Sequence, residues 1–142
     1  NMPEKIKKKY NPSNQKIILF TGRMIPDKNP DKLILSFPKI KKHFPRAKII
    51  FVGPIDKQYK KELLNLIPAK FKKDLIFTGS LHPVKDVRKI FSFYKIADVF
   101  VSIGSWEGLP TRIIEALSQN TPVIAYASGG SKQYTKKFYQ SF

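Results

Sequence analysis

Short apolar runs alternate along this chain with longer segments in which apolar residues recur at helical spacing. The runs are rich in β-branched and aromatic residues, and glycine, proline or polar residues follow them, which is typical of buried strands in a parallel sheet. The pattern predicts strands over residues 17–21, 47–52, 75–78, 99–102 and 122–126.

The segments between these runs have the apolar stripe of an amphipathic helix. They predict helices over residues 31–44, 56–67, 84–97 and 111–119. The stripes place these side chains, among others, toward the core: Leu33, Phe37, Phe44, Leu63, Val87, Ile90, Tyr94, Ile113 and Ile114.

Three residues set expectations for how these helices begin, bend and end. Asp31 is expected to cap the first helix, because its carboxylate can accept from free main-chain N–H groups. Pro38 is expected to kink that helix or split it in two, because it lacks an N–H group. Asn120 is expected to end the last helix in the left-handed conformation, in place of the usual glycine.

Strands that alternate with helices predict an α/β fold: a single Rossmann-like domain whose mostly parallel sheet has helices on both faces. The common strand order in such sheets is 3-2-1-4-5. Residues 1–15 are polar and turn-rich and are interpreted as a linker or leading arm, with the domain itself over residues 16–142. The chain stops at Phe142 without an obvious finish, so the domain is expected to be truncated at its C-terminus.

Strand order decides which loops meet, since ligands of open parallel sheets bind beyond the carboxyl ends of the strands at the switch in strand order. The loop after the first strand carries Gly22, Arg23 and Lys28. Arginine offers a bidentate fork and lysine a movable point charge, so this pair could clamp a diphosphate. In so basic a chain, solvated loop cations are the ordinary alternative.

The loop after the fourth strand reads S-I-G-S-W-E-G-L-P-T-R-I-I-E-A over residues 102–116. Gly108 permits close approach of the backbone to a ligand, and Pro110 suits the first turn of a helix. The main-chain N–H groups of Leu109 and Thr111, with that of Arg112, would point out of the helix start toward an anion. These features predict a phosphate-binding site at the start of the helix.

Two carboxylates belong to the same stretch. Glu107 lies in the loop and Glu115 about one turn into the helix, so both can reach one crevice from different depths. Carboxylates suit sugar hydroxyls. The alternative interpretation is that one glutamate caps the helix and the other is only solvated. Cations, a helix start and carboxylates together describe a sugar nucleotide better than a free sugar or nucleotide. The chain lacks the glycine motifs of dinucleotide oxidoreductases and of P-loop enzymes.

The net charge of the chain limits the kinds of binding partner that are expected. The formal net charge is +17, from 27 Lys and Arg against 10 Asp and Glu, which favours phosphates, anionic membranes or polyanions. Most of the excess is lysine, whereas specific nucleic-acid readers rely on arginine and interleaved aromatic residues. We therefore expect no nucleic-acid partner. The alternative, a basic nucleic-acid-binding Rossmann-like module, would explain the charge but leave the two glutamates unexplained.

The chain has no cysteine, so disulfides, thiolate metal sites and cysteine nucleophiles are excluded. His43 and His82 have no partner at ligand spacing, and no metal site is predicted. No apolar run reaches membrane-spanning length and no signal-peptide pattern begins the chain. A cytoplasmic location is expected, with peripheral contact at the cytosolic membrane face.

The run E-G-L-P-x-x-x-x-E-A, followed by N-T-P-V-I-A, closely resembles the donor-binding signature of retaining GT-B glycosyltransferases of family four (group 1). The similarity covers roughly residues 16–130, with Pro38 and residues from Ser131 onward untypical. It implies that Arg23 and Lys28 hold the donor diphosphate and that Glu107 lies near the transferred sugar.

The same resemblance implies further contacts. The backbone of residues 109–111 would lie near phosphate and Glu115 on the nucleotide ribose. The run F-T-G-S-L looks like the segment whose backbone contacts the base, near Gly79, Ser80 and Leu81.

As a whole, the resemblance implies one half of a GT-B fold: the C-terminal, nucleotide-sugar-binding domain of an enzyme that transfers a sugar to a glycan or lipid-linked acceptor. An N-terminal domain of the same chain would bind the acceptor. No cofactor or metal would be required beyond the nucleotide-sugar donor. This piece alone would be inactive, and a non-catalytic nucleotide-binding module is the remaining alternative.

Overall fold

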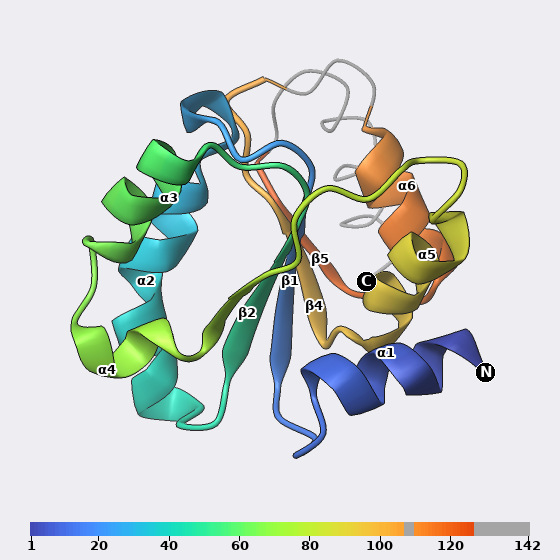
Figure 1. Cartoon of the computed structure of the whole chain (residues 1–142), viewed down its shortest axis with the longest axis horizontal. Helices are drawn as coiled ribbons and strands as arrows, with labels where there is room; N and C mark the ends of the chain where they lie inside the picture. The colour runs from blue at the N-terminus through green and yellow to red at the C-terminus, as the bar shows by residue number, and fades with distance from the viewer. Residues whose placement is uncertain (107–109, 127–142) are drawn as a thin grey trace, which may run out of the picture.

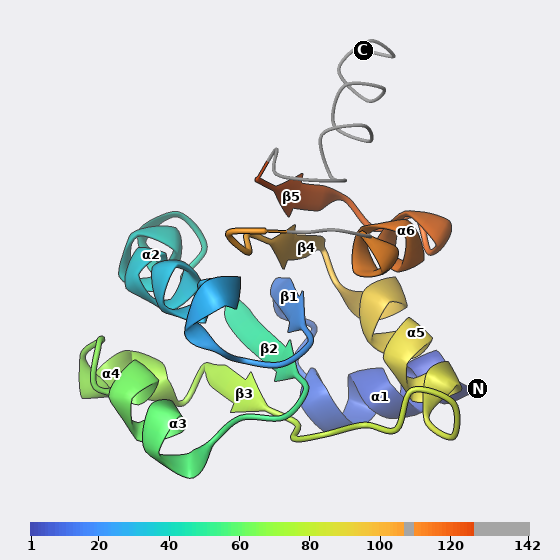
Figure 2. The ribbon, with the colours of Figure 1, turned by 90° about the horizontal axis from the view of Figure 1, so that it is seen from above.

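The computed structural model describes residues 1–106 and 110–126. Within these residues, parallel strands form one five-stranded sheet in the order β3-β2-β1-β4-β5. Figure 2 shows helices on both faces of it. The predicted α/β Rossmann-like fold and its strand order are confirmed. The strands, which agree with the predicted ranges to within a residue, are β1 Ile17–Thr21, β2 Lys48–Val52, β3 Leu75–Phe77, β4 Val99–Ser102 and β5 Val123–Ala125.

The helices divide into two groups (Figure 1). One face carries α2, α3 and α4, and the other carries α1, α5 and α6. A short 3-10 helix, η1, lies in the loop between β1 and α2. Their bounds are α1 Met2–Tyr10, η1 Pro26–Lys28, α2 Pro30–His43, α3 Lys57–Leu64, α4 Ala69–Lys72, α5 Val87–Ile96 and α6 Thr111–Ser118.

The central strand β1 is buried on both faces, as expected of an interior parallel strand. Ile18 and Phe20 pack into the cluster under α2 and α3. Ile17 and Leu19 point the opposite way, into the cluster under α5 and α6. Because β1 is fixed by both cores and pairs with β2 and β4, the loop that follows it begins from a rigid point.

Residues 1–15, predicted as a polar, turn-rich linker or leading arm, contain a helix instead. Asn1 caps α1 by accepting from the Glu4 N–H at 3.0 Å. Ile6 is buried, and the Tyr10 ring lies 5.2 Å from that of Phe93 in α5. An apolar residue at every fourth position makes a narrow stripe that the intervening lysines hide. The role of this segment as a linker or leading arm stays a prediction.

The start of α2 differs from the prediction. Its N-cap is Asn29, with φ 56°, and Asp31 lies inside the first turn, so Asp31 does not cap the helix. Pro30 occupies the first helical position, where a missing N–H costs nothing. A single helix runs through Pro38, so the predicted split is wrong, and the alternative of a kink stays a prediction. Packing of the stripe that includes Phe37 supports the helix across the proline.

Some apolar side chains predicted to face the core do not. Phe44, Val87 and Ile114 are 53%, 41% and 42% exposed. Phe44 follows the last residue of α2 and Val87 begins α5, where the helical stripe no longer faces the sheet. Ile114 lies on the outer side of α6, whose neighbour Ile113 is buried. Asn120 has φ 57°, which confirms the left-handed end predicted for α6.

The length and polarity of the helices decide whether any of them could span a membrane. Among the described residues, the helices are too short or too polar for any of them to cross a bilayer.

Candidate functional site

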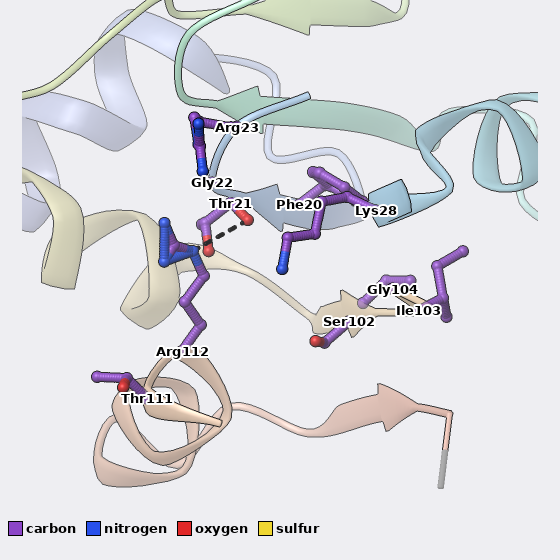
Figure 3. Close-up of a pocket in the computed structure, with 11 residues that line it drawn as sticks. Phe20, Thr21, Gly22, Arg23, Lys28, Ser102, Ile103, Gly104, Thr111 and Arg112 are labelled. Carbon is purple, nitrogen blue, oxygen red and sulfur yellow. Dashed lines mark hydrogen bonds between the residues drawn. The ribbon is translucent and has the colours of Figure 1, made fainter. Parts of the chain in front are cut away.

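A pocket of about 240 Å³ opens at the carboxyl ends of β1 and β4, where the strand order reverses (Figure 3). One wall comes from the end of β1 and the loop after it, and the other from the end of β4 and the start of α6. This is the crevice that the strand order predicts. Its lining residues are Phe20, Thr21, Gly22, Arg23, Lys28, Val101, Ser102, Ile103, Gly104, Thr111 and Arg112.

Direct hydrogen bonds hold the two loops together. The buried Asn29 side chain donates from Nδ2 to the Ile103 carbonyl at 2.8 Å and to Ser105 Oγ at 3.2 Å. The Ser105 N–H donates to the Asp27 carbonyl at 2.8 Å. The left-handed backbone of Asn29, which asparagine tolerates, aims its amide across the gap. The loop with the two cations therefore keeps a fixed position relative to the loop after β4.

Glycines shape the floor of the pocket. Gly22 has φ +111°, a conformation that other residues rarely adopt, and its N–H donates to the Val52 carbonyl at 2.8 Å. Gly53, with φ +146°, lies so close that a Cβ there would be 2.1 Å from the Gly22 carbonyl oxygen. The turn after β1 is thus pressed against the turn after β2 by main-chain contact.

A buried phenol connects the pocket to α6. The Tyr94 hydroxyl donates to Glu115 Oε2 at 2.9 Å and also lies 2.9 Å from Thr21 Oγ1. Burial raises the pKa of Tyr94 above its ordinary value, and the Glu115 carboxylate raises it further, against the opposing effect of the Thr21 bond. Tyr94 therefore stays protonated and orients the Glu115 carboxylate.

The structure brings together some of the predicted site residues. Gly22, Arg23, Lys28 and Thr111 line the pocket. Pro110 is buried and forms the N-cap of α6. The predictions for Glu107, Gly108 and Leu109 fall outside the described residues.

Other predicted residues lie nearby or apart. Glu115 is tied to the pocket residue Thr21 through Tyr94. Gly79, Ser80 and Leu81 follow β3 and do not line the pocket. They share its sheet edge, since the Gly53 N–H donates to the Gly79 carbonyl at 3.1 Å.

Three contributors were not recognised from the sequence as side chains of the site: Tyr94, Asn29 and Arg112. Tyr94 was assigned to the core, which is correct, but its hydroxyl also serves the site. The side chain of Arg112 reaches the pocket, where only its main-chain N–H was expected. A cation in the first turn of a helix opposes the helix dipole, and that was the available signal.

Across residues 1–106 and 110–126, His, Asp and Glu side chains form no group of three or more that could hold a metal ion. The expectation that no metal is required stays a prediction.

The fold and the pocket define a Rossmann-like domain with a crevice at its switch point that cationic side chains line. The chain belongs to the family described as glycosyl transferases group 1, whose model matches residues 1–142. A curated relative, the putative glycosyltransferase YtcC of Bacillus subtilis, is 32% identical over 137 residues, which cover 92% of this chain and 32% of the relative. The chain thus spans about a third of the length of that relative.

Solved structures agree with this assignment. The C-terminal domain of the group 1 glycosyl transferase LpcC from Francisella tularensis superposes with a TM-score of 0.72 at 26% identity, over 91% of this chain and 66% of that one. HepE of Anabaena, in complex with UDP-glucose, gives 0.77 at 22% identity, over 92% of this chain and 35% of that one. The predicted resemblance to the C-terminal half of a GT-B glycosyltransferase is confirmed.

Proposed function

We propose that this chain is the donor-binding domain of a retaining glycosyltransferase and that its pocket binds the diphosphate of a nucleotide-sugar. The observation that carries the proposal is the convergence of Arg23, Lys28 and the start of α6 on one pocket between β1 and β4. Two cations and a helix N-terminus suit a diphosphate. The similar fold of HepE, solved with UDP-glucose, supports the same ligand class.

Each part of the donor has a candidate partner. Arg23, Lys28 and the first N–H groups of α6 bind the diphosphate. Glu115, oriented by Tyr94, accepts hydrogen bonds from ribose hydroxyls. The base is assigned to residues 79–81 and the transferred sugar to Glu107, and the backbone of residues 109–111 adds to the phosphate contacts.

The chemistry of these residues follows from charge. When the bond between the anomeric carbon and the β-phosphate oxygen breaks, negative charge grows on the leaving nucleoside diphosphate. Arg23, Lys28 and the α6 dipole stabilise that charge, so no metal is required for this step. The acceptor, which is a glycan or a lipid-linked acceptor, is bound by an N-terminal domain of the same longer protein.

The net charge of +17 supports a second element of the proposal, peripheral contact with an anionic membrane at the cytosolic face. The exposed lysines of α1, Lys5 and Lys7 to Lys9, add to this charge. Sedimentation with vesicles tests it: binding to phosphatidylglycerol vesicles, lost in high salt and absent with phosphatidylcholine, is expected. Equal binding to both lipids contradicts it.

A thermal-shift screen of the 142-residue chain with UDP-, GDP- and ADP-sugars tests the donor proposal. A ligand that binds only the folded state stabilises it by about 2.7 kcal/mol when its concentration is about 100 times Kd. We expect one nucleotide series to raise the midpoint clearly. If none of the three series does so at millimolar concentration, the domain is not a donor site.

A further inference from the structure

The side chain of Arg112 crosses the pocket. Arg112 is the second residue of α6, and its side chain extends back toward the end of β1 (Figure 3). There its Nε donates to the main-chain carbonyl of Thr21 at 3.3 Å. A residue from the helix start thus places its charge over the strand end on the opposite wall.

The fit between Arg112 and Gly22 is close. A Cβ on Gly22 would lie 2.7 Å from Arg112 Nε and 3.0 Å from its Cζ. Two features therefore favour glycine at position 22. Its backbone has φ +111°, and any side chain there would displace the Arg112 guanidinium. The guanidinium rests against bare backbone at the floor of the pocket.

This position contributes little to folding. The Arg112 side chain is exposed. Its hydrogen bond to the Thr21 carbonyl is long and uses only one of the five N–H donors of the guanidinium. In the part of the chain that the structure describes, the other four donors have no hydrogen-bond partner and Arg112 forms no ion pair. Its charge also opposes the positive end of the α6 dipole. A bound anion would relieve that opposition.

The surroundings specify what kind of anion fits. Arg23 and Lys28 line the same pocket from the other loop, so three cationic side chains surround one space. The nearby Glu115 carboxylate accepts from Tyr94 and does not pair with Arg112. A guanidinium binds phosphate oxygens in pairs, and a diphosphate offers enough oxygens for all three cations.

We propose that Arg112 is a third phosphate ligand of this site, whose guanidinium binds non-bridging oxygens of the donor diphosphate together with Arg23 and Lys28. This inference rests on the proposed function and adds a side chain to it. The only described bond that the guanidinium must release is the 3.3 Å contact with Thr21. Because phosphate is what it recognises, its contribution should be the same for any base.

Calorimetry with three probes tests the inference on the wild type and on the variants Arg112→Ala, Arg112→Lys and Arg88→Ala. UDP and GDP report on the diphosphate with two bases, and inorganic pyrophosphate reports on it without a base. Arg88→Ala is the matched control, because it removes the same charge from an exposed position of α5 outside the pocket. Thermal midpoints confirm that each variant is folded.

We expect Arg112→Ala to weaken pyrophosphate and the nucleotide that binds best by about tenfold or more, the loss of a hydrogen bond to a charged group. Arg112→Lys should recover part of the loss, and Arg88→Ala should bind like the wild type. If the wild type binds but Arg112→Ala binds equally well, the role of Arg112 is overturned alone. If the wild type binds none of the probes, the proposed function fails and this inference fails with it.

Discussion

The hydroxyl of Tyr94 lies 2.9 Å from Glu115 Oε2, so a buried side chain of α5 fixes a carboxylate of α6. An ionised carboxylate only accepts hydrogen bonds, which commits the Tyr94 proton to Glu115. The hydroxyl of Thr21, also 2.9 Å away, must then donate to Tyr94. This chain of bonds connects the end of β1 to the carboxylate that we assign to the ribose.

Replacing Tyr94 with phenylalanine should separate the hydroxyl from the ring. The variant Tyr94→Phe keeps the packing but loses both bonds, so its free energy of unfolding should fall by about 1 to 3 kcal/mol in urea denaturation. Calorimetry should show weaker binding of UDP and unchanged binding of pyrophosphate, because we propose that Glu115 binds the ribose. Tyr59→Phe, on the opposite face of the sheet, is the control. Unchanged UDP affinity in Tyr94→Phe would remove Tyr94 from the site.

Alkaline pH should destabilise the wild type partly through Tyr94. Burial, with Glu115 adding to it, raises the pKa of the folded Tyr94 above the ordinary value of 10.0. The unfolded chain releases this proton first, so stability is fully present below about pH 10 and falls as the pH rises further. Tyr94→Phe should show a slope smaller by up to about 1.4 kcal/mol per pH unit there. Parallel curves of unfolding free energy against pH would contradict the assignment.

Asn29 should matter through its side chain as well as its backbone. Asn29→Gly keeps the left-handed conformation but removes the bonds to Ile103 and Ser105, so a loss of about 1 to 3 kcal/mol in unfolding free energy is expected. Asn29→Ala should lose about 1 kcal/mol more, since it adds left-handed strain. Urea denaturation measures both. A glycine variant as stable as the wild type would show that these bonds do not join the two loops.

The contact between Gly53 and Gly22 should make Gly53 intolerant of any side chain. Gly53→Ala would bring a Cβ within 2.1 Å of a main-chain oxygen, so a loss of about 3 kcal/mol or more, or failure to fold, is expected. Gly79→Ala is the matched control: its φ of +80° is also positive, but among the described residues no atom beyond its chain neighbours lies within 4 Å of the new Cβ. Soluble yield and urea midpoints compare the two. Equal losses would mean that backbone strain, and not the contact, dominates.

Much of the fold could be predicted because its periodicities are strong. Each strand is a compact apolar run that must be buried on both faces, and strand order follows from the alternation with helices. The pocket follows in turn from strand order, so the sequence predicts that Arg23, Lys28 and Thr111 lie together, as they do in the structure. The helix over residues 2–10 was not predicted, because its apolar stripe is only one residue wide and most of the other residues are lysines.

Side-chain reach could not be predicted in the same way. The path of Arg112 depends on the bare surface of Gly22, and the bond from Tyr94 depends on how α5 packs beside α6. Both relationships join residues far apart in the sequence, and neither changes the hydrophobic pattern. The side-chain amide of Asn29 reaches Ile103 only because the backbone of Asn29 is left-handed. The sequence Asn29-Pro30 permits that conformation but does not require it.

The most direct measurement of the central claim is calorimetric titration of UDP and GDP into the wild type, Arg23→Ala and Lys28→Ala, with Arg88→Ala as the control for charge. The wild type and the control should bind one of these nucleotides with the same affinity. Each pocket variant should lose about 1.5 to 3 kcal/mol of binding free energy, because it removes a cation that we propose binds the diphosphate. A wild type that binds neither nucleotide, or pocket variants that bind like the wild type, would contradict that claim.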